Sequence, residues 1–470
     1  MTFDPFWSIE QLSERFARRE LSSVEAVTEF ARRISALDGQ LHAFCQVDES
    51  GALARARAAD EARANGTSTS PLLGMPLAVK DIFDQAGHGT HAGSNALNDR
   101  FPTRSANAVE RLESAGMIAI GRTNMVEFAY GGWGTNPAQG APCNPWRQDT
   151  RVVAGGSSSG SAVAIASGFA PAALGTDTGG SIRTPAAWCG IVGLKTSVGL
   201  VGRGGVVPLS PTHDSVGPMT RTVRDAALLL EAMVGADPRD VATWYVPSVR
   251  PLAMIEDGVK GLRLGMLHER DLAGVEPDIR MLYDRAIADL TALGAQFHKI
   301  ALPLSISDYL GRGGEIMSVE SYALLSAYVD HPDSLVDPVI AERISRGRDI
   351  SGPAYYRLLE TRRLAQIGFQ AAAAGFDAFV TPGSHRSPVP LAEVDESQPP
   401  NHFGRLVNYL DLASLAVPVG LTSNGLPAGL QIVVRKFDDA LALRIGRALE
   451  RERGGLFMPA PGLLRNEAKH

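Results

Sequence analysis

The sequence contains little cysteine and no large excess of charge of one sign. Only three cysteines, Cys45, Cys143 and Cys189, occur among its 470 residues. This odd, sparse set excludes a disulfide framework and has no zinc-ligand spacing, so it favours a reducing compartment. Acidic residues number 51 and basic residues 45, and neither kind forms a long block. Because a nucleic-acid binder would show a basic face, we expect no nucleic-acid partner.

The sequence also lacks a hydrophobic run long enough to cross a bilayer. The most apolar stretch, SAVAIASGFAPAALG, is short and is interrupted by Gly168 and Pro171. The first twenty residues have no basic segment followed by an apolar core, which argues against a signal peptide. We therefore expect a cytoplasmic protein that does not bind a membrane. Hydrophobic residues at 44% and charged residues at 20% are typical of a globular protein with a large core.

Hydrophobic periodicity predicts an α/β protein. Residues 8–65 carry apolar side chains at helical spacing, and two of the predicted helices begin behind serine N-caps. Short apolar runs bounded by Gly, Pro and Asp then alternate with helical stretches, as in α/β folds. The simplest organisation is one domain over residues 1–470, with N-terminal helices over 1–70, a core over 71–225, a mostly helical region over 226–375, and a return to the sheet with a final helix over 376–460.

Two short motifs are typical of hydrolases but do not complete a site. GSSSG fits G-x-S-x-G, the nucleophile elbow of α/β-hydrolases, with Ser158 as the nucleophile. That mechanism also needs an aspartate and then a histidine, and neither His385 nor His402 stands in a recognisable context. TDTGG resembles the Asp-Thr-Gly of aspartic proteases, but no second copy supplies the other carboxylate. An α/β-hydrolase-type esterase with Ser158 therefore stays a minor alternative.

Three other places combine into a more complete site. Lys80 ends the apolar run PLAVK, where burial would lower the pKa of a lysine and allow it to act as a neutral base. Ser157 is the first serine of GGSSSGS, and Ser181 follows two glycines in GTDTGGS. Such glycines let consecutive backbone N–H groups converge on one point, as an oxyanion hole requires. Alone, each motif is equally typical of a surface lysine or a turn, so the functional interpretation depends on their combination.

Together, these motifs resemble the amidase signature family. GRTNMVEFAYG, AAWCGIVGLKTS and SNGLPAGLQIVVRKFDDA are similar to neighbouring parts of that family. The resemblance extends from about residue 8 to about residue 455 and is thinnest between about 230 and 375, the segment in which family members chiefly differ. It implies one three-layer α/β/α domain around a mixed, mostly parallel twisted sheet. It also implies hydrolysis of an amide, anilide or carbamate bond without a metal or organic cofactor.

The resemblance assigns a role to each residue of the catalytic site. Ser181 is the nucleophile that forms the acyl-enzyme, Ser157 relays protons from a cis peptide bond, and Lys80 is the base. Asp177 and Arg183 flank the nucleophile, and we expect them to pair and fix this loop rather than to bind substrate. The oxyanion hole is expected to consist of the backbone N–H groups of Thr178, Gly179, Gly180 and Ser181.

The residues expected to contact the substrate are mostly apolar. They include the helical stretch IMSVESYALLSAYV and the loop residues Ala129, Tyr130, Gly131, Gly132 and Trp133. Because the basic candidate Arg183 is assigned to Asp177, these residues favour a neutral, largely apolar substrate. A small amide-type molecule is therefore the expected partner, and aryl acylamidase and urethanase activities are options. The resemblance also leaves a homodimer open.

Two alternatives to a stand-alone amidase follow from the same motifs. The A subunit of glutamyl-tRNA amidotransferases shares the family core but supplies ammonia to partner subunits. The stretch FAYGGWGTNPAQGAP lacks the TENS-like sequence associated with that subunit, which favours the stand-alone enzyme. A non-catalytic scaffold is disfavoured because Lys80, Ser157 and Ser181 are all present.

Overall fold

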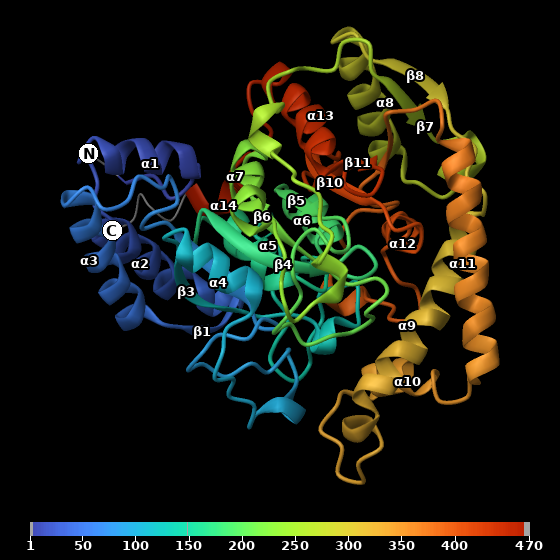
Figure 1. The fold of residues 1–470 in the computed structure, drawn as a ribbon, viewed down its shortest axis with the longest axis horizontal. Helices are drawn as coiled ribbons and strands as arrows, with labels where there is room; N and C mark the ends of the chain where they lie inside the picture. Colours follow the sequence, from blue (N-terminus) through green and yellow to red (C-terminus); the bar gives the residue numbers. More distant parts are fainter. Residues whose placement is uncertain (1–2, 148, 465–470) are drawn as a thin grey trace.

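A mixed sheet crosses the whole protein and carries helices on both faces (Figure 1). The computed structural model describes residues 3–147 and 149–464. Within these residues the sheet has eleven strands in the order β1-β3-β2-β4-β6-β5-β10-β11-β9-β7-β8. The strands are β1 (Phe44–Val47), β2 (Pro76–Lys80), β3 (Ile118–Thr123), β4 (Ala172–Asp177), β5 (Val192–Lys195), β6 (Ser215–Thr220), β7 (Arg263–Met266), β8 (Gln296–Lys299), β9 (Ala378–Pro382), β10 (Ala413–Leu421) and β11 (Pro427–Val434).

The N-terminal helices begin where the sequence predicts. Ser8 caps α1 through Gln11, and Ser22 caps α2 through Glu25; in both, side chains and backbone N–H groups exchange hydrogen bonds as a capping box. Strand β1, which precedes α3, was not predicted. It is a short, mostly exposed edge strand without alternating apolar residues. The helices of this part are α1 (Ile9–Ala17), α2 (Ser23–Leu41) and α3 (Glu49–Ala64).

The core segment brings two chemically important strand ends together. Strands β3, β2 and β4 are parallel neighbours, so their carboxyl ends meet at one edge of the sheet. Lys80 ends β2 and Asp177 ends β4. Polar side chains at or just after the ends of these strands therefore lie close together at the same edge of the sheet. The helices of this segment are α4 (Asn107–Ser114), α5 (Ser159–Ala166), α6 (Arg183–Cys189) and α7 (Val223–Met233).

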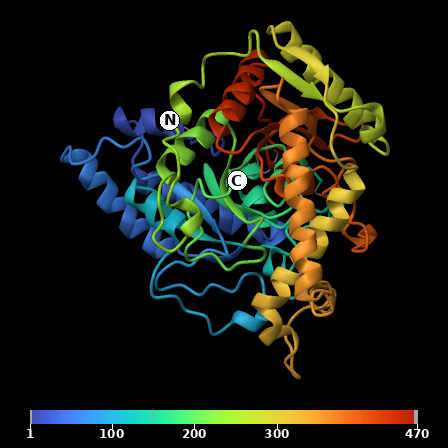
Figure 2. The ribbon, with the colours of Figure 1, turned by 45° about the vertical axis from the view of Figure 1, so that its right-hand side comes forward.

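The region over 226–375 is mostly helical, as predicted. The run GLRLGML, whose texture predicts a strand, forms β7, and the region adds a further strand, β8. Strands β7 and β8 pair in parallel with each other, and β7 pairs with β9. Long helices α9 and α11 lie side by side beyond this edge (Figure 2). The later helices are α8 (Pro277–Ala292), α9 (Ile306–Val329), α10 (Pro338–Ser345), α11 (Gly352–Ala372), α12 (Gly404–Tyr409), α13 (Asp439–Glu452) and α14 (Pro461–Leu464).

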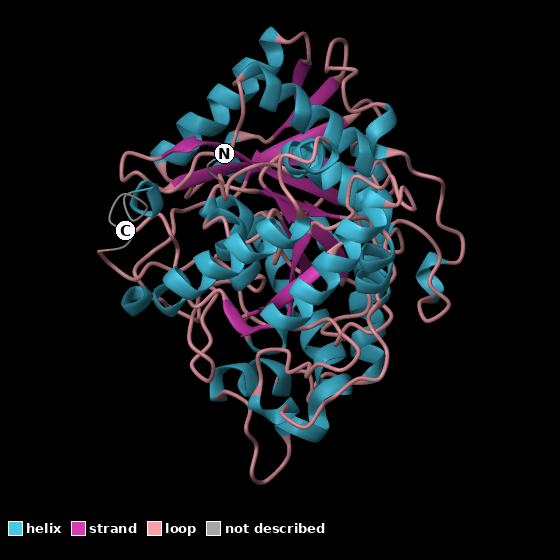
Figure 3. Cartoon of the chain, turned by 90° about the vertical axis from the view of Figure 1, so that its left-hand side faces the viewer, coloured by secondary structure: helices cyan, strands magenta, loops and turns pink. Residues whose placement is uncertain are grey.

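Helices cover both faces of the central strands, which gives the three layers (Figure 3). Leu415 and Val417 of β10 point toward Gly446 of α13, where a Cβ would contact them. On the other face, Gln431 of β11 accepts a hydrogen bond from Arg183 of α6. Because alternate residues of a strand point to opposite faces, α6 and α13 lie on opposite sides of the same strands.

The predicted α/β class and mixed sheet are confirmed, but the prediction that the sheet is mostly parallel is wrong. Among the described strands, only the β3–β2–β4 and β9–β7–β8 groups are parallel, and the other neighbouring strands pair antiparallel. A tight turn joins β10 to β11, and such a connection forces an antiparallel pair. No described helix is both long and apolar enough to span a bilayer.

Candidate active site

Three hydroxyl groups surround the amine of Lys80 at the end of β2. Lys80 Nζ lies 2.9 Å from Ser157 Oγ, 2.9 Å from Ser158 Oγ and 2.8 Å from Thr176 Oγ1. The lysine is fully buried. Burial lowers the pKa of Lys80 to about 7, even though the charge of Asp177 raises it. Close to neutral pH, a large share of this amine is therefore uncharged.

The hydrogen bonds of Ser158 determine how the neutral amine is oriented. Ser158 Oγ donates to the Thr176 carbonyl at 3.2 Å, so it accepts the hydrogen bond from Lys80. Thr176 Oγ1 accepts a second N–H of Lys80. A neutral amine has two N–H groups and one lone pair, and both N–H groups are then used. The lone pair is left facing the hydroxyl of Ser157, which Lys80 can therefore deprotonate.

The serine-rich loop connects the lysine to the second serine motif. The peptide bond between Gly156 and Ser157 is cis, as the resemblance implies. Ser158 N–H donates to the carbonyl of Ser181 at 3.1 Å, so the loops that carry the proposed relay and the proposed nucleophile are in contact. A Cβ on Gly156 would lie 2.7 Å from the backbone nitrogen of Gly134, so only glycine fits there.

The loop before Ser181 leaves three backbone N–H groups without an acceptor in the part of the chain that the structure describes. The hydrogen bonds of this loop engage Gly180 N–H with Asp177 at 2.9 Å and Ile182 N–H with Asp177 at 3.1 Å. None engages the N–H groups of Thr178, Gly179 or Ser181. The prediction for the oxyanion hole therefore fails at Gly180, whose N–H is already used to hold the loop.

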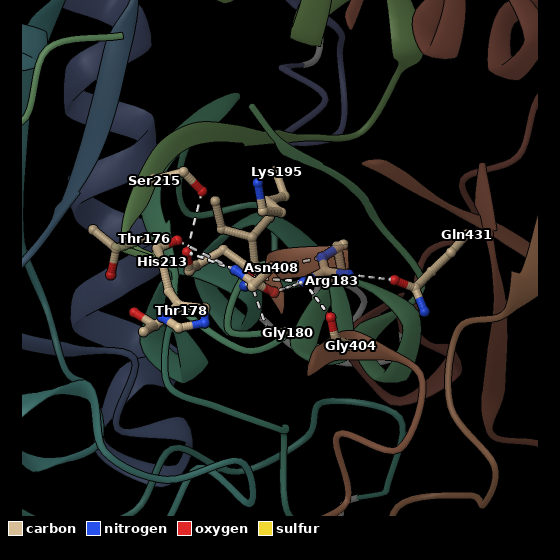
Figure 4. A network of polar contacts seen from close by, with 12 residues as sticks. Thr176, Thr178, Gly180, Arg183, Lys195, His213, Ser215, Gly404, Asn408 and Gln431 are labelled. Carbon is tan, nitrogen blue, oxygen red and sulfur yellow. Dashed lines mark hydrogen bonds and ion pairs between the residues drawn. The ribbon is translucent and has the colours of Figure 1, made fainter. Parts of the chain in front are cut away.

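A buried ion pair fixes this loop, and Figure 4 shows the contacts around it. Arg183 binds the Asp177 carboxylate through two nitrogens, at 2.9 and 2.8 Å, and both side chains are fully buried. Arg183 also donates to Gln431 Oε1, Asn408 Oδ1 and the Gly404 carbonyl. The loop is thus tied to β11 and α12, and every side-chain nitrogen of Arg183 already has a hydrogen-bond partner within the protein.

The charge of Asp177 is stabilised within this network. Burial opposes ionisation, but the charge and hydrogen bonds of Arg183 and the charge of Lys195 hold the pKa of the Asp177 carboxyl well below its usual range. Lys195 is itself buried, which lowers its pKa to about 8. Its Nζ donates to two backbone carbonyls, those of Thr196 and Leu412, so this second buried amine serves the strand and not the serines.

A cavity of about 340 Å³ lies beside the loop that precedes Ser181. Thr176, Thr178 and Ala129 line it on the side of the site, whereas Ser157 and Ser181 do not line it. Asp214 lines it too, accepting a hydrogen bond from Thr178 Oγ1 at 2.5 Å. Burial raises the pKa of Asp214 to about 6. The cavity therefore abuts the candidate site through Thr178 without containing the serine hydroxyls.

The predicted substrate-contacting loop, residues 129–133, lies next to the serine-rich loop, but the side chain of Trp133 points into the core. Gly132 accepts a hydrogen bond from Gly156 N–H at 2.7 Å, and the Tyr130 carbonyl accepts one from Arg343. Trp133, however, is only 1% exposed and packs with Val153 and Trp188. Its indole ring offers no surface to a substrate, so the prediction for Trp133 is replaced by a core role.

The structure gives no support to Ser158 as a nucleophile. Its hydroxyl is fully buried and is already engaged with Lys80 and Thr176. His385 and His402 lie against each other, with ring centroids 4.8 Å apart, and neither forms a hydrogen bond to Ser158. The nucleophile elbow is therefore incomplete here.

Sequence reasoning missed two polar residues beside the loop. A Cβ on Gly179 would lie 3.3 Å from Arg405 Nε, and one on Gly180 would lie 3.4 Å from Asn401 Cβ. Asn401 Oδ1 and Arg405 Nε are buried without a hydrogen-bond partner. The expectation of an uncharged pocket considered only Arg183 as the cation and overlooked Arg405. Two adjacent glycines inside a helical stretch, Gly313 and Gly314, were a signal in the sequence that another side chain approaches closely there.

Comparisons with known proteins connect this geometry to a family. The family model described as Amidase matches residues 25–443. The A subunit of glutamyl-tRNA(Gln) amidotransferase from Anaeromyxobacter sp. (strain K) is 38% identical over 474 residues, covering 95% of each chain. The same subunit from Roseiflexus castenholzii (strain DSM 13941 / HLO8) is 37% identical over 480 residues, covering 94% of this chain and 95% of the relative.

Solved structures of several amide-directed proteins share the fold over nearly the full length. Peptide amidase from Stenotrophomonas maltophilia gives a TM-score of 0.86 at 31% identity, covering 96% of this chain and 98% of that one. A bacterial aryl acylamidase of the amidase signature family gives 0.88 at 25% identity, covering 99% of each chain. The amidotransferase A subunit from Thermotoga maritima gives 0.81 at 29% identity, covering 98% and 99%.

Removing the arginine of the buried ion pair tests its structural role. We expect Arg183→Met to lower the free energy of unfolding by about 3–5 kcal/mol, because it leaves Asp177 charged and unpaired in the interior. Arg346→Met is the control, since Arg346 pairs with Glu342 at the surface and keeps 67% of its side chain exposed. It should leave the free energy of unfolding nearly unchanged, because exposed ion pairs contribute little. Urea unfolding of both variants checks this, and equal losses would contradict the assignment.

Proposed function

Since the chain belongs to the amidase signature family and is an amide-hydrolysing enzyme, we propose that Ser181 is its nucleophile, Ser157 its proton relay and Lys80 its base. The observation that carries this proposal is the geometry of Lys80. Its amine is buried, has a pKa of about 7 and directs its lone pair at Ser157, whose loop contacts that of Ser181. A buried neutral amine next to a hydroxyl is a suitable base for nucleophilic catalysis.

In the acylation step, Ser181 Oγ forms a bond to the substrate carbonyl carbon. Its proton passes to Ser157 Oγ while the Ser157 proton passes to Lys80 Nζ. The carbonyl oxygen gains negative charge and accepts hydrogen bonds from the free N–H groups of Thr178, Gly179 and Ser181. The carbon–nitrogen bond then breaks, and the leaving amine takes a proton back through Ser157. Ser181 is left as an ester.

In the deacylation step, water attacks the ester by the same route. A water molecule gives its proton to Ser157, and Lys80 again receives the relayed proton. The bond between Ser181 Oγ and the acyl carbon breaks, and the returned proton restores the Ser181 hydroxyl. In the described structure no hydrogen bond joins Ser181 Oγ to Ser157, and such contacts often tighten only when substrate binds. These steps need only the three side chains and the backbone donors.

A second candidate function is glutamine hydrolysis that supplies ammonia to a partner protein. The observation that favours it is full-length similarity, at 37–38% identity, to A subunits of glutamyl-tRNA(Gln) amidotransferase. The absence of a TENS-like sequence weighed against this function, but that stretch is short and the similarity covers about 95% of the chain. The same Ser181 chemistry would serve both functions, with glutamine as the acyl donor in the second.

Activity should increase with pH through neutrality. Lys80 must be uncharged to act as the base, and burial lowers its pKa to about 7. We therefore expect kcat/KM for a substrate without ionisable groups to rise about tenfold per pH unit below about pH 7 and to level off above it. A pH profile from 5 to 9 measures this. An activity maximum below about pH 6 would instead indicate a carboxylate base.

One serine should react with an acylating probe, and the three residues should act as a unit. We expect a fluorophosphonate to label Ser181, as located by peptide mapping, and alanine at Ser181, Ser157 or Lys80 to cost several orders of magnitude in rate. Double variants should lose little more than single ones, because members of a relay are strongly non-additive. Labelling of Ser158, or multiplicative losses, would count against the relay.

Purified chain alone should distinguish the two candidate functions. We expect it to hydrolyse simple primary amides and anilides without any added protein, because the relay lies entirely within this chain. Ammonia release from glutamine and nitroaniline release from a nitroanilide are compared under the same conditions. Activity that appears only after candidate partner subunits are added would favour the ammonia-supplying function over the stand-alone enzyme.

A further inference from the structure

A cationic side chain lies against the proposed oxyanion loop without an anionic partner. Arg405, in α12, approaches Gly179 so closely that a Cβ there would lie 3.3 Å from its Nε and 3.9 Å from its Nη2. Its only hydrogen bond in the described residues is from Nη1 to the Leu310 carbonyl of α9, at 2.8 Å. No described carboxylate lies within ion-pair distance, and Nε has no acceptor. The Nε–Nη2 edge is therefore free on the side of Gly179.

Arg405 is half-buried, and several fully buried arginines of the described chain have more hydrogen-bond partners than it has. Arg122 and Arg183 each bind an aspartate. Arg221 and Arg362 lack such a partner but donate to several backbone carbonyls each. Arg405 has a single carbonyl for its five N–H groups. Its other N–H groups are therefore available to a ligand, and its buried Nε has no acceptor in the described residues.

Helix α9 is adapted to accommodate this side chain. A Cβ on Gly313 would lie 2.8 Å from Arg405 Cδ, and one on Gly314 would lie 2.9 Å from its Nη1. Each glycine in a helix interior costs about 1 kcal/mol relative to alanine, so the pair is unfavourable for α9 itself. The space that it creates is occupied by Arg405, which indicates that the position of the guanidinium is built into the fold.

Nearby charges do not neutralise Arg405. Arg343, the next cation, is paired with Glu396 at 2.8 Å and donates to the Tyr130 carbonyl. Asn401 adds a second polar group, since its buried Oδ1 has no partner and would clash with a Cβ on Gly132. The side chains next to Gly179 and Gly180 thus include one cation without an anionic partner and one neutral amide.

We propose that Arg405 binds a carboxylate on the acyl part of the substrate, so that the enzyme acts on amides whose acyl group carries a negative charge. The Nε–Nη2 edge of a guanidinium matches the two oxygens of a carboxylate. This inference rests on the proposed function, because it places the acyl group beside Gly179 when Ser181 attacks. It replaces the expectation of a neutral, apolar substrate.

Three amides with the same scissile bond test the proposal. Glutaramate carries a carboxylate, its methyl ester does not, and glutamine carries the carboxylate with an added ammonium group. We expect the unmodified chain to have a higher kcat/KM for glutaramate than for the ester, by tenfold or more. Arg405→Met should reduce the ratio of kcat/KM for glutaramate to kcat/KM for the ester by about 10–100-fold, the effect usually seen when a charge-assisted pair of hydrogen bonds is lost. The exposed Arg285 of α8 provides the matched control, Arg285→Met, which should leave the ratio unchanged.

The results of these assays distinguish failure of the carboxylate site from failure of the proposed amidase function. Equal losses on glutaramate and its ester in Arg405→Met, or no preference in the unmodified chain, would overturn the proposed carboxylate site. A higher kcat/KM for glutamine than for glutaramate, with the same dependence on Arg405, would show that the bound group is the carboxylate of an amino acid.

A binding measurement keeps the test independent of turnover. Glutarate binding to Ser181→Ala is measured by calorimetry, with and without Arg405→Met. Binding weakened at least tenfold by Arg405→Met supports the carboxylate site even if no amide is hydrolysed, a result that would count only against the proposed function. Equal glutarate binding by the two proteins would overturn the carboxylate site.

Discussion

The exclusion of water from the amine of Lys80 is the constraint on which the site depends. Lys80 ends β2, a central strand between its parallel neighbours β3 and β4, and its side chain is fully buried. The groups around the amine are hydroxyls, which accept its hydrogen bonds without stabilising its charge as a carboxylate would. The negative charge of Asp177 would raise the pKa of Lys80, but Asp177 is bound by Arg183. The ion pair therefore supports the loop and also limits the effect of a negative charge on the lysine.

Much of the fold and most of the catalytic constellation could be predicted from the sequence, because both are encoded locally. Apolar periodicity marked the long helices and strands such as β10, and motifs marked Lys80, Ser157 and Ser181. Strands β1, β5, β6 and β8 were not predicted. Strands β1 and β8 are short, mostly exposed edge strands without clear alternation, whereas β5 and β6 are short, buried and contain glycine or proline. The direction of β5 and β6 depends on connections whose geometry no local pattern specifies.

The details of the site that were missed depend on contacts between distant segments. The motif alone could not show that Asp177 would accept the N–H of Gly180, since that requires the folded loop. Arg405 lies far along the chain from Gly179, in a short helix with no motif of its own. The pairing of Arg183 with Asp177 was predicted correctly, whereas the cation Arg405 was not, because local composition cannot show a charge contributed by a distant element.

The contacts of Arg183 also determine when during synthesis the site can form. This side chain binds Gln431 in β11 and Asn408 in α12, whereas the lysine and serines that it supports lie in the first half of the chain. A ribosome delivers the N-terminal elements first, and domains of this size often fold through intermediates. The loop that carries Ser181 therefore acquires its anchors only after almost the whole polypeptide has emerged. Nascent and truncated chains would contain Lys80, Ser157 and Ser181 before the contacts that hold the loop of Ser181 can form.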